Sequence, residues 1–203
     1  MRILLISDEE SPYFWDHYKA GRLDGIDLIL SAGDLKPEYL SFLVTLGRAP
    51  VLYVQGNHDG IYERRPPEGC ECIDDKLVTV KGLRILGLGG CQLYNGGPHQ
   101  YSESQMRRRI HRQYLALHRS RGIDILLTHA PLRGYGDEDS LPHRGFEAFF
   151  PLLDRYQPAY MVHGHIHQRY TPRMERVLQY HNTTIINACG YYILDIPDPP
   201  AKT

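Results

Sequence analysis

Acidic, amide and imidazole side chains recur along this chain shortly after short apolar segments. The run 51–54, for example, leads through one glutamine into Gly56-Asn57-His58-Asp59. Carboxylate, amide and imidazole groups bind divalent cations, and one carboxylate can bridge two of them. The pattern therefore predicts a metal site assembled from distant parts of the chain. The side chains placed in this way are Asp8, Asp34, Asn57, His58, Asp59, His129, His163, His165 and His167.

The apolar segments indicate which elements must hold these side chains. They are short, rich in Ile, Val and Leu, and separated by amphipathic stretches long enough to be helices. Such runs are typical of buried strands in an α/β architecture. Polar groups just past the carboxyl ends of strands converge in one crevice of such sheets. We therefore predict an α/β fold with the polar groups gathered at one edge.

Four helices and several later strands are predicted from local patterns. A Ser11-Pro12 start and aromatic residues at helical spacing predict a helix that ends near Gly21 and buries its aromatic face. Ser102-x-x-Gln105 is a capping box whose helix would bury Tyr114 and leave its arginines, Arg109 included, largely in solvent. The predicted helices are 11–21, 37–47, 102–120 and 145–156, and the later strands are 77–80, 83–88, 177–180, 184–188 and 191–196.

Five motifs follow one another in a fixed order. They are Asp8 with a charged residue two positions on, Gly33-Asp34, Gly56-Asn57-His58-Asp59, Thr128-His129 and Gly164-His165-Ile166-His167. Over roughly residues 3–190 this order and spacing resemble the calcineurin-like metallophosphoesterases. The resemblance implies two facing mixed β-sheets flanked by α-helices, a four-layer α/β/β/α sandwich.

The resemblance also implies how the ligands are shared between two divalent metal ions. A bridging carboxylate keeps such ions about 3.5 to 4 Å apart, close enough to clamp a phosphoryl group and to activate a water that attacks phosphorus. Manganese is the expected metal, with iron, zinc, magnesium and nickel as alternatives. In the family's arrangement Asp8 and His167 hold one ion, Asn57, His129 and His165 hold the other, and Asp34 bridges both.

Two further residues of the matching motifs would take part in catalysis. His58 would assist the leaving group as an acid, and Asp59 would orient its imidazole. Each residue alone has a structural explanation, because a lone histidine is more often part of a core and Asp34 could cap the following helix. The agreement of five motifs favours the metal site.

One position departs from the family's pattern. The family has Asp-x-His where this chain has Asp8-Glu9-Glu10, so Glu10 stands in the place of an imidazole. An oxygen ligand there would make the first site harder and favour manganese or magnesium. Glu10 is equally compatible with a supporting position beside the ligands. His163, which precedes the Gly164 motif, is expected to support the site rather than to bind metal.

Two polar loops are candidates for substrate contacts. The glycine-rich loop 94–101 lies between a strand end and a helix, and the loop 133–146 follows His129. A cationic pair in the second loop would suit a substrate phosphate or its leaving group. Ordinary surface positions are the competing interpretation for both loops. The candidate contacts are Asn95, His99, Tyr101, His143 and Arg144.

The composition limits the class of protein. At 203 residues the chain suits one domain, predicted over 1–196 with a loose tail over 197–203. A formal net charge of −1 offers no global field to nucleic acid or a membrane surface. The four cysteines and the quickly acidic start favour a reducing, cytoplasmic setting. A small-molecule phosphoester is therefore the expected partner, and the oligomeric state is open.

A metal-dependent phosphoesterase is the leading functional hypothesis, with phosphodiesters favoured over monoesters. The preference comes from a likeness of Thr128-His129-Ala130-Pro131 and of the Gly164 motif to the small phosphodiesterase branch. A catalytically weakened binding scaffold of the same fold is one alternative, although it would have no use for His58. A nuclease is the other, suggested by the arginine-rich segment 107–121.

Overall fold

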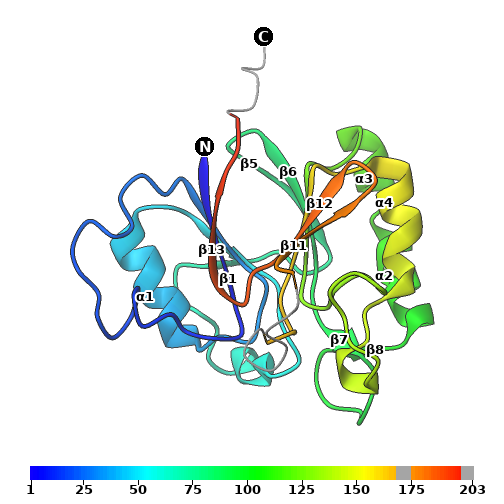
Figure 1. Ribbon diagram of the computed structural model, residues 1–203, viewed down its shortest axis with the longest axis horizontal. Helices are drawn as coiled ribbons and strands as arrows, with labels where there is room; N and C mark the ends of the chain where they lie inside the picture. Colours follow the sequence, from blue (N-terminus) through cyan, green and yellow to red (C-terminus); the bar gives the residue numbers. More distant parts are fainter. Residues whose placement is uncertain (168–174, 198–203) are drawn as a thin grey trace.

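The computed structural model describes residues 1–167 and 175–197. Two large mixed β-sheets face each other, and helices flank the pair on opposite sides (Figure 1). This is the four-layer arrangement predicted from the sequence, so the fold class is confirmed. The predicted loose tail lies outside the described residues except for Pro197.

The first sheet carries three of the predicted ligand-bearing loops. Its four parallel strands are extended by one antiparallel strand at the edge beside the chain's first strand. In spatial order it consists of β13 (Gly190–Asp195), β1 (Arg2–Ser7), β2 (Leu28–Ser31), β3 (Val51–Tyr53) and β4 (Glu71–Cys72).

The second sheet has four parallel strands in its centre and an antiparallel strand at each edge. The predicted hairpin around Lys81-Gly82 forms one of these edges. In spatial order the sheet consists of β11 (Val177–Tyr180), β12 (Thr183–Asn187), β10 (Tyr160–His163), β9 (Ile125–Thr128), β6 (Leu83–Leu88) and β5 (Lys76–Val80), and a separate pair joins β7 (Cys91–Gln92) to β8 (Gln100–Tyr101).

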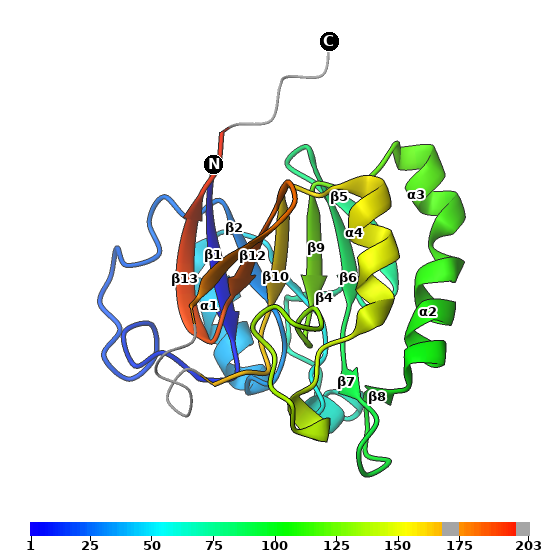
Figure 2. The same ribbon diagram turned by 45° about the vertical axis from the view of Figure 1, so that its right-hand side comes forward.

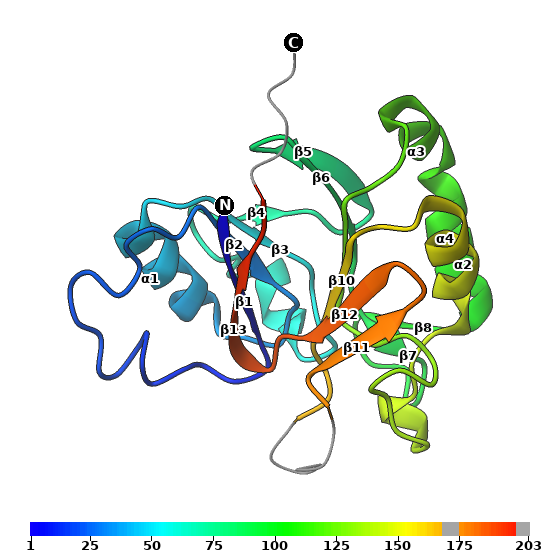
Figure 3. The ribbon, with the colours of Figure 1, turned by 45° about the horizontal axis from the view of Figure 1, so that its top comes forward.

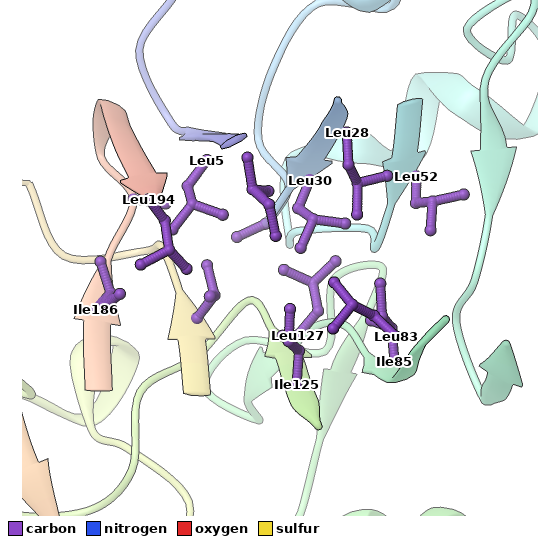
Figure 4. Close-up of a cluster of buried hydrophobic side chains, with 14 of the residues drawn as sticks. Leu5, Leu28, Leu30, Leu52, Leu83, Ile85, Ile125, Leu127, Ile186 and Leu194 are labelled. Carbon is purple, nitrogen blue, oxygen red and sulfur yellow. The ribbon is translucent and has the colours of Figure 1, made fainter. Parts of the chain in front are cut away.

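The alternation of side chains along each strand explains why the sheets stack. In β1, Leu5 points into the cluster between the sheets, whereas Leu4 points to the outer face. In β9, Leu127 likewise points between the sheets, and Leu126 points to the outer face. Because every second residue faces the same side of a strand, a continuous apolar run buries both faces. Figure 4 shows leucines of the first sheet meeting isoleucines and leucines of the second across this core.

Helices cover the two outer faces. Among the described residues, α1 packs on the first sheet, and α2, α3 and α4 pack on the second, as the views of Figures 1 and 3 agree. The Ser102 side chain and Gln105 form the predicted capping box. The helices are α1 (Pro37–Gly47), α2 (Glu103–Arg112), α3 (Tyr114–Ser120) and α4 (Phe150–Tyr156), with short 3-10 turns at Asp59–Glu63, Leu141–His143 and Glu147–Phe149.

The helix predicted for 11–21 is wrong, because this segment forms successive turns. The carbonyl groups of Tyr13 and His17, which a helix would use internally, accept hydrogen bonds from the Arg22 guanidinium instead. The aromatic residues nevertheless face inward in part, since Phe14 is buried and the half-buried Trp15 makes edge-to-face contacts with residues of α1. Tertiary contacts therefore replace the local helical pattern.

The predicted helix 102–120 is divided at Gln113, and two of its side chains face the opposite way from the prediction. Tyr114 is 38% exposed rather than part of the buried face, whereas Arg109 is only 6% exposed. Arg109 Nε donates to Asp75 at 2.8 Å, and Nη1 donates to the Gly89 carbonyl at 2.7 Å. One of the arginines that suggested a nucleic-acid partner is therefore a structural residue.

Replacing Arg109 with Ala is expected to lower the free energy of unfolding by about 3–5 kcal/mol. The change would leave the buried Asp74 carboxylate without its cation, which lies 3.5 Å away, and the Gly89 carbonyl without its donor. Urea titration followed by circular dichroism measures the loss. Arg108→Ala, on the exposed face of the same helix, should change stability by less than about 0.5 kcal/mol. Equal losses in the two variants would contradict the assignment.

None of the helices in the described part of the chain combines the length and the apolar character needed to cross a membrane.

Candidate metal centre

The loops that carry the predicted ligands meet at one edge of the stacked sheets. In Figure 2, β1 and β9 run downward, so their carboxyl ends lie at the lower edge. Asp8 follows β1, Asp34 follows β2, Asn57 follows β3, His129 follows β9 and His165 follows β10. Of these, Asp34, His129 and His165 each offer a ligand atom within 4.8 Å of the others.

The hydrogen bonds of His129 decide which of its nitrogen atoms faces the site. Nδ1 lies 2.7 Å from the Ala32 carbonyl oxygen, so it carries a proton and donates it there. Nε2 is then left facing two oxygen atoms, Oδ1 of Asn57 at 3.1 Å and Oδ2 of Asp34 at 3.3 Å. Three potential ligand atoms thus lie close together. In metal sites, a histidine ligand commonly has its second nitrogen fixed by a hydrogen bond in this way.

His165 is held in a comparable way by the polar loop 133–146. Its Nε2 lies 2.7 Å from the Pro142 carbonyl oxygen and donates to it, which leaves Nδ1 to accept a cation. Burial lowers the pKa of His165 to about 3, so its imidazole is neutral. A neutral imidazole with a free lone pair is the form that binds metals. The loop therefore lies beside the site, as predicted.

The backbone at three candidate ligands is left-handed. Asp8, Asp34 and His165 have φ values of 62°, 57° and 69°. Non-glycine residues seldom adopt this region, and such conformations gather at functional sites where the surroundings hold them. For Asp8 the surroundings include the His165 backbone N–H, which donates to both carboxylate oxygens at 3.0 and 2.8 Å. This bond ties the end of β1 to the end of β10.

Glycines make room for the carboxylates. A Cβ atom at Gly56 would lie 2.1 Å from Oδ1 of Asp34, and one at Gly164 would lie 2.5 Å from Oδ2 of Asp8. A Cβ at Gly33 would lie 2.4 Å from the backbone nitrogen of Gly56. Only glycine permits these approaches, which explains the Gly-Asp, Gly-Asn and Gly-His pairs of the motifs.

The electrostatics of the group match a cation site. Burial opposes charge on both His129 and Asp34, yet their mutual attraction outweighs it and raises the pKa of His129 while it lowers that of Asp34. Burial raises the pKa of Asp8. The raised pKa of His129 shows that positive charge is favoured next to these buried carboxylates. Since the donors are carboxylate, amide and imidazole, the residues fit a divalent metal.

Asp59 is buried beside the candidate ligands, and His58 is exposed next to it. The Oδ2 atom of Asp59 accepts hydrogen bonds from the backbone N–H groups of Asp34 at 2.8 Å and Gly56 at 2.7 Å, so it joins two ligand loops. Burial and then the nearby Asp34 raise the pKa of Asp59 to about 7. The His58 backbone N–H donates to Oδ1 of Asp34 at 2.8 Å, and His58 itself is exposed to solvent. Asp59 thus holds the backbone of the loop that carries His58, and its predicted role toward the imidazole stays a prediction.

Glu10 contacts Lys36, at the start of the first helix. Its Oε1 atom accepts a hydrogen bond from the Lys36 backbone nitrogen at 3.2 Å and lies 3.7 Å from the Lys36 ammonium group. It thus supports the start of α1, in line with the supporting alternative.

His167 lies beside Glu9, with Nδ1 3.3 Å from Oε1 of Glu9. His163 is buried with a pKa lowered by that burial to about 4, and it contacts the Gly164 carbonyl.

The predicted substrate contacts differ in how they are held. Oδ1 of Asn95 accepts from the Gly97 backbone at 3.0 Å, so it shapes its own loop. His99 is half-buried with φ at 51°, and burial lowers its pKa. The His143 ring lies 5.4 Å from the His165 ring, which brings it to the metal centre. Arg144 is exposed and donates to the Asp139 carbonyl.

Tyr94 and Cys189 were missed by the sequence patterns. The Tyr94 hydroxyl accepts a hydrogen bond of 3.4 Å from Nδ2 of Asn57, which leaves Oδ1 turned toward His129. No sequence spacing reports such a contact. Cys189, close to His167 and Glu9, follows a predicted strand directly, so the strand-end rule used for the other ligands would have found it.

A four-layer sandwich whose strand ends gather carboxylate, amide and imidazole ligands defines a metal-binding α/β protein. Residues 1–169 match the model of the calcineurin-like phosphoesterases, and the chain belongs to that family.

Three comparisons agree with this assignment. The chain is 27% identical over 195 residues to a UPF0046 protein of Caenorhabditis elegans, in an alignment that covers 80% of this chain and 62% of that relative. The chain therefore spans less than two thirds of that relative's length.

The crystal structure of TT1561 of Thermus thermophilus matches with a TM-score of 0.60 at 16% identity, covering 93% of this chain and 88% of that one. A 5'-nucleotidase from Candida albicans SC5314 matches with a TM-score of 0.51 at 13% identity, covering 92% and 44%. The two structural matches show a shared fold.

Proposed function

We propose that this protein is a metal-dependent hydrolase of phosphoesters, with a phosphodiester as the favoured substrate. The observation that carries the proposal is the convergence of Asp34, His129 and His165, each with a ligand atom within 4.8 Å of the others. Both histidines direct their second nitrogen to a backbone carbonyl, so the remaining nitrogen is available to a cation. Membership of the calcineurin-like phosphoesterases supports the same reaction class.

Two divalent ions, manganese first among the candidates, would be shared among the converging residues. When bound, such ions lower the pKa of a water and neutralise charge on a phosphoryl group. Asp8 and Asp34, which burial would otherwise penalise as charged groups, supply the negative charge that such ions need. In the proposed arrangement Asn57, His129 and His165 would hold one ion, Asp8 and His167 would hold the other, and Asp34 would be shared by both.

The residues around the ligands would orient the substrate and its leaving group. His58 sits on the loop fixed by Asp34 and Asp59, and its exposed position suits an acid that protonates a departing oxygen. Tyr94 and the Ala32 carbonyl hold Asn57 and His129 in their orientations. Beside them, His143 would contact a phosphate oxygen or the leaving group from the loop over the site.

Hydrolysis of bis(nitrophenyl) phosphate and nitrophenyl phosphate by metal-free protein, with and without added Mn²⁺, tests the proposal. We expect turnover only with a divalent ion and faster turnover of the diester. His58→Ala should keep its metal and lose rate by about 10²-fold or more on alkyl esters, which have poor leaving groups, and much less on nitrophenyl esters.

Two outcomes of these assays would count against the proposal. Absence of turnover with every divalent cation would exclude the hydrolase. If His58→Ala instead lost its metal, or lost rate equally on all esters, His58 would not be the leaving-group acid. Wild-type protein without added metal is the control for metal dependence, and wild-type protein with the same metal is the control for His58→Ala.

A further inference from the structure

A second group of potential ligands lies next to the centre described above. It comprises Glu9, His167 and Cys189, each of which offers an atom within 4.8 Å of the others. Nδ1 of His167 is 3.3 Å from Oε1 of Glu9, and Cys189 is only 4% exposed. We propose that Glu9 and the Cys189 thiolate bind, together with His167, the metal ion on this side of the centre.

The fold places these residues together through backbone contacts. Cys189 pairs with Ser7 in an isolated parallel bridge. The segment after β12 therefore lies beside the end of β1, and Glu9 follows Ser7 by two residues. Asn187 ties the third residue in place, because its Oδ1 accepts from the Cys189 backbone at 2.8 Å and its Nδ2 donates to the Ile166 carbonyl at 2.8 Å. One buried amide side chain thus fixes both the cysteine and the segment that carries His167.

The turn after β1 selects Glu9 rather than Glu10. The Glu9 backbone nitrogen donates to the Ser7 carbonyl at 2.6 Å, and Asp8 between them is left-handed. Glu10 is then engaged by Lys36 at the start of α1. The acidic residue next to His167 is therefore Glu9. It lies one position before Glu10, the residue that stands in the place of the family's histidine.

A set of thiolate, imidazole and carboxylate has a definite metal preference. Sulfur ligands favour zinc, iron and cobalt over magnesium or manganese, which prefer oxygen. A cavity of about 550 Å³, lined in part by Glu9 and Cys189, adjoins the group and would admit a further ligand. The ion on this side would accordingly be softer than manganese.

This inference rests on the proposed function in one respect, the role of His167 as a metal ligand. It is tested with cobalt alone, because a cobalt–thiolate bond gives an intense charge-transfer absorption in the near ultraviolet that oxygen and nitrogen ligands do not give. We expect metal-free protein titrated with Co²⁺ to show this absorption. Cys189→Ser should abolish it, and Glu9→Gln should weaken cobalt binding at this position by more than about 10-fold.

Matched controls separate these effects from general damage. The Cys70→Ser/Cys72→Ser double variant, which removes the half-buried cysteines, should keep the absorption, and Glu10→Gln should bind cobalt as the wild type does. Wild-type protein that binds cobalt without the charge-transfer absorption would overturn this inference and leave the proposed function standing, whether or not Cys189→Ser folds. Persistence of the absorption in folded Cys189→Ser, or its loss in the double variant, would also overturn it. Failure to bind cobalt or any divalent ion at all would overturn both proposals.

Discussion

Replacing Asp34 with Asn is expected to remove bound metal and to lower kcat by about 10²–10³-fold or more. The figure corresponds to the several kcal/mol of transition-state stabilisation that a metal ion supplies to phosphoryl transfer. Asp34 is the carboxylate nearest the His129 nitrogen, at 3.3 Å, and its other oxygen holds the His58 backbone. Asparagine keeps the size of the side chain but removes the charge that attracts the cation.

Metal content by elemental analysis and kcat with a diester measure the effect of Asp34→Asn. Asp24→Asn, an exposed acid in the segment before β2, is the matched control and should retain both metal and rate. Full metal content and full activity in Asp34→Asn would show that this carboxylate does not hold the centre together.

Gly56→Ala is expected to have a comparable effect without changing any ligand. The added methyl group would lie 2.1 Å from Oδ1 of Asp34 and 2.7 Å from Cε1 of His129, so both side chains would have to move. Such overpacking typically costs about 1–3 kcal/mol of stability. Displacement of two ligands should lower kcat by about 10²-fold, because catalysis depends on their geometry to within an ångström.

The neighbouring glycine Gly60 provides the control for Gly56→Ala. A methyl group there would meet only Pro98, at 3.2 Å, so Gly60→Ala should keep metal and activity near wild type. Metal content, kcat and thermal unfolding of both variants make the comparison. If Gly56→Ala were fully active, the tight packing of Asp34 and His129 around this glycine would not matter for the site.

The strand-end rule predicted much of the site from sequence. It placed Asp34, His129 and His165 at one edge because parallel strands end there, and the structure brings their ligand atoms together. What the rule lacked was the path of the chain after each strand. In the proposed site the left-handed turn at Asp8 would select Glu9 over Glu10, and the His165 backbone N–H that holds Asp8 is a long-range contact that no local pattern reports.

The errors in secondary structure and in burial have the same origin. The segment 11–21 has helical spacing, but the Arg22 guanidinium donates hydrogen bonds to two of its carbonyl groups. Trp15 of the same segment packs against α1. Arg109 was predicted to be solvated because arginine is usually exposed, yet acids from a distant loop surround it. In both cases long-range contacts outweighed a local preference. The roles of individual ligands, the natural ester and the cytoplasmic setting stay predictions.

Diffraction from crystals grown with Mn²⁺, recorded where manganese scatters anomalously, tests the central claim most directly. We predict an anomalous peak among the side chains of Asp34, Asn57, His129 and His165, within bonding distance of the His129 nitrogen that faces Asn57. A peak elsewhere, or no peak at a manganese concentration that supports full activity, would contradict the account.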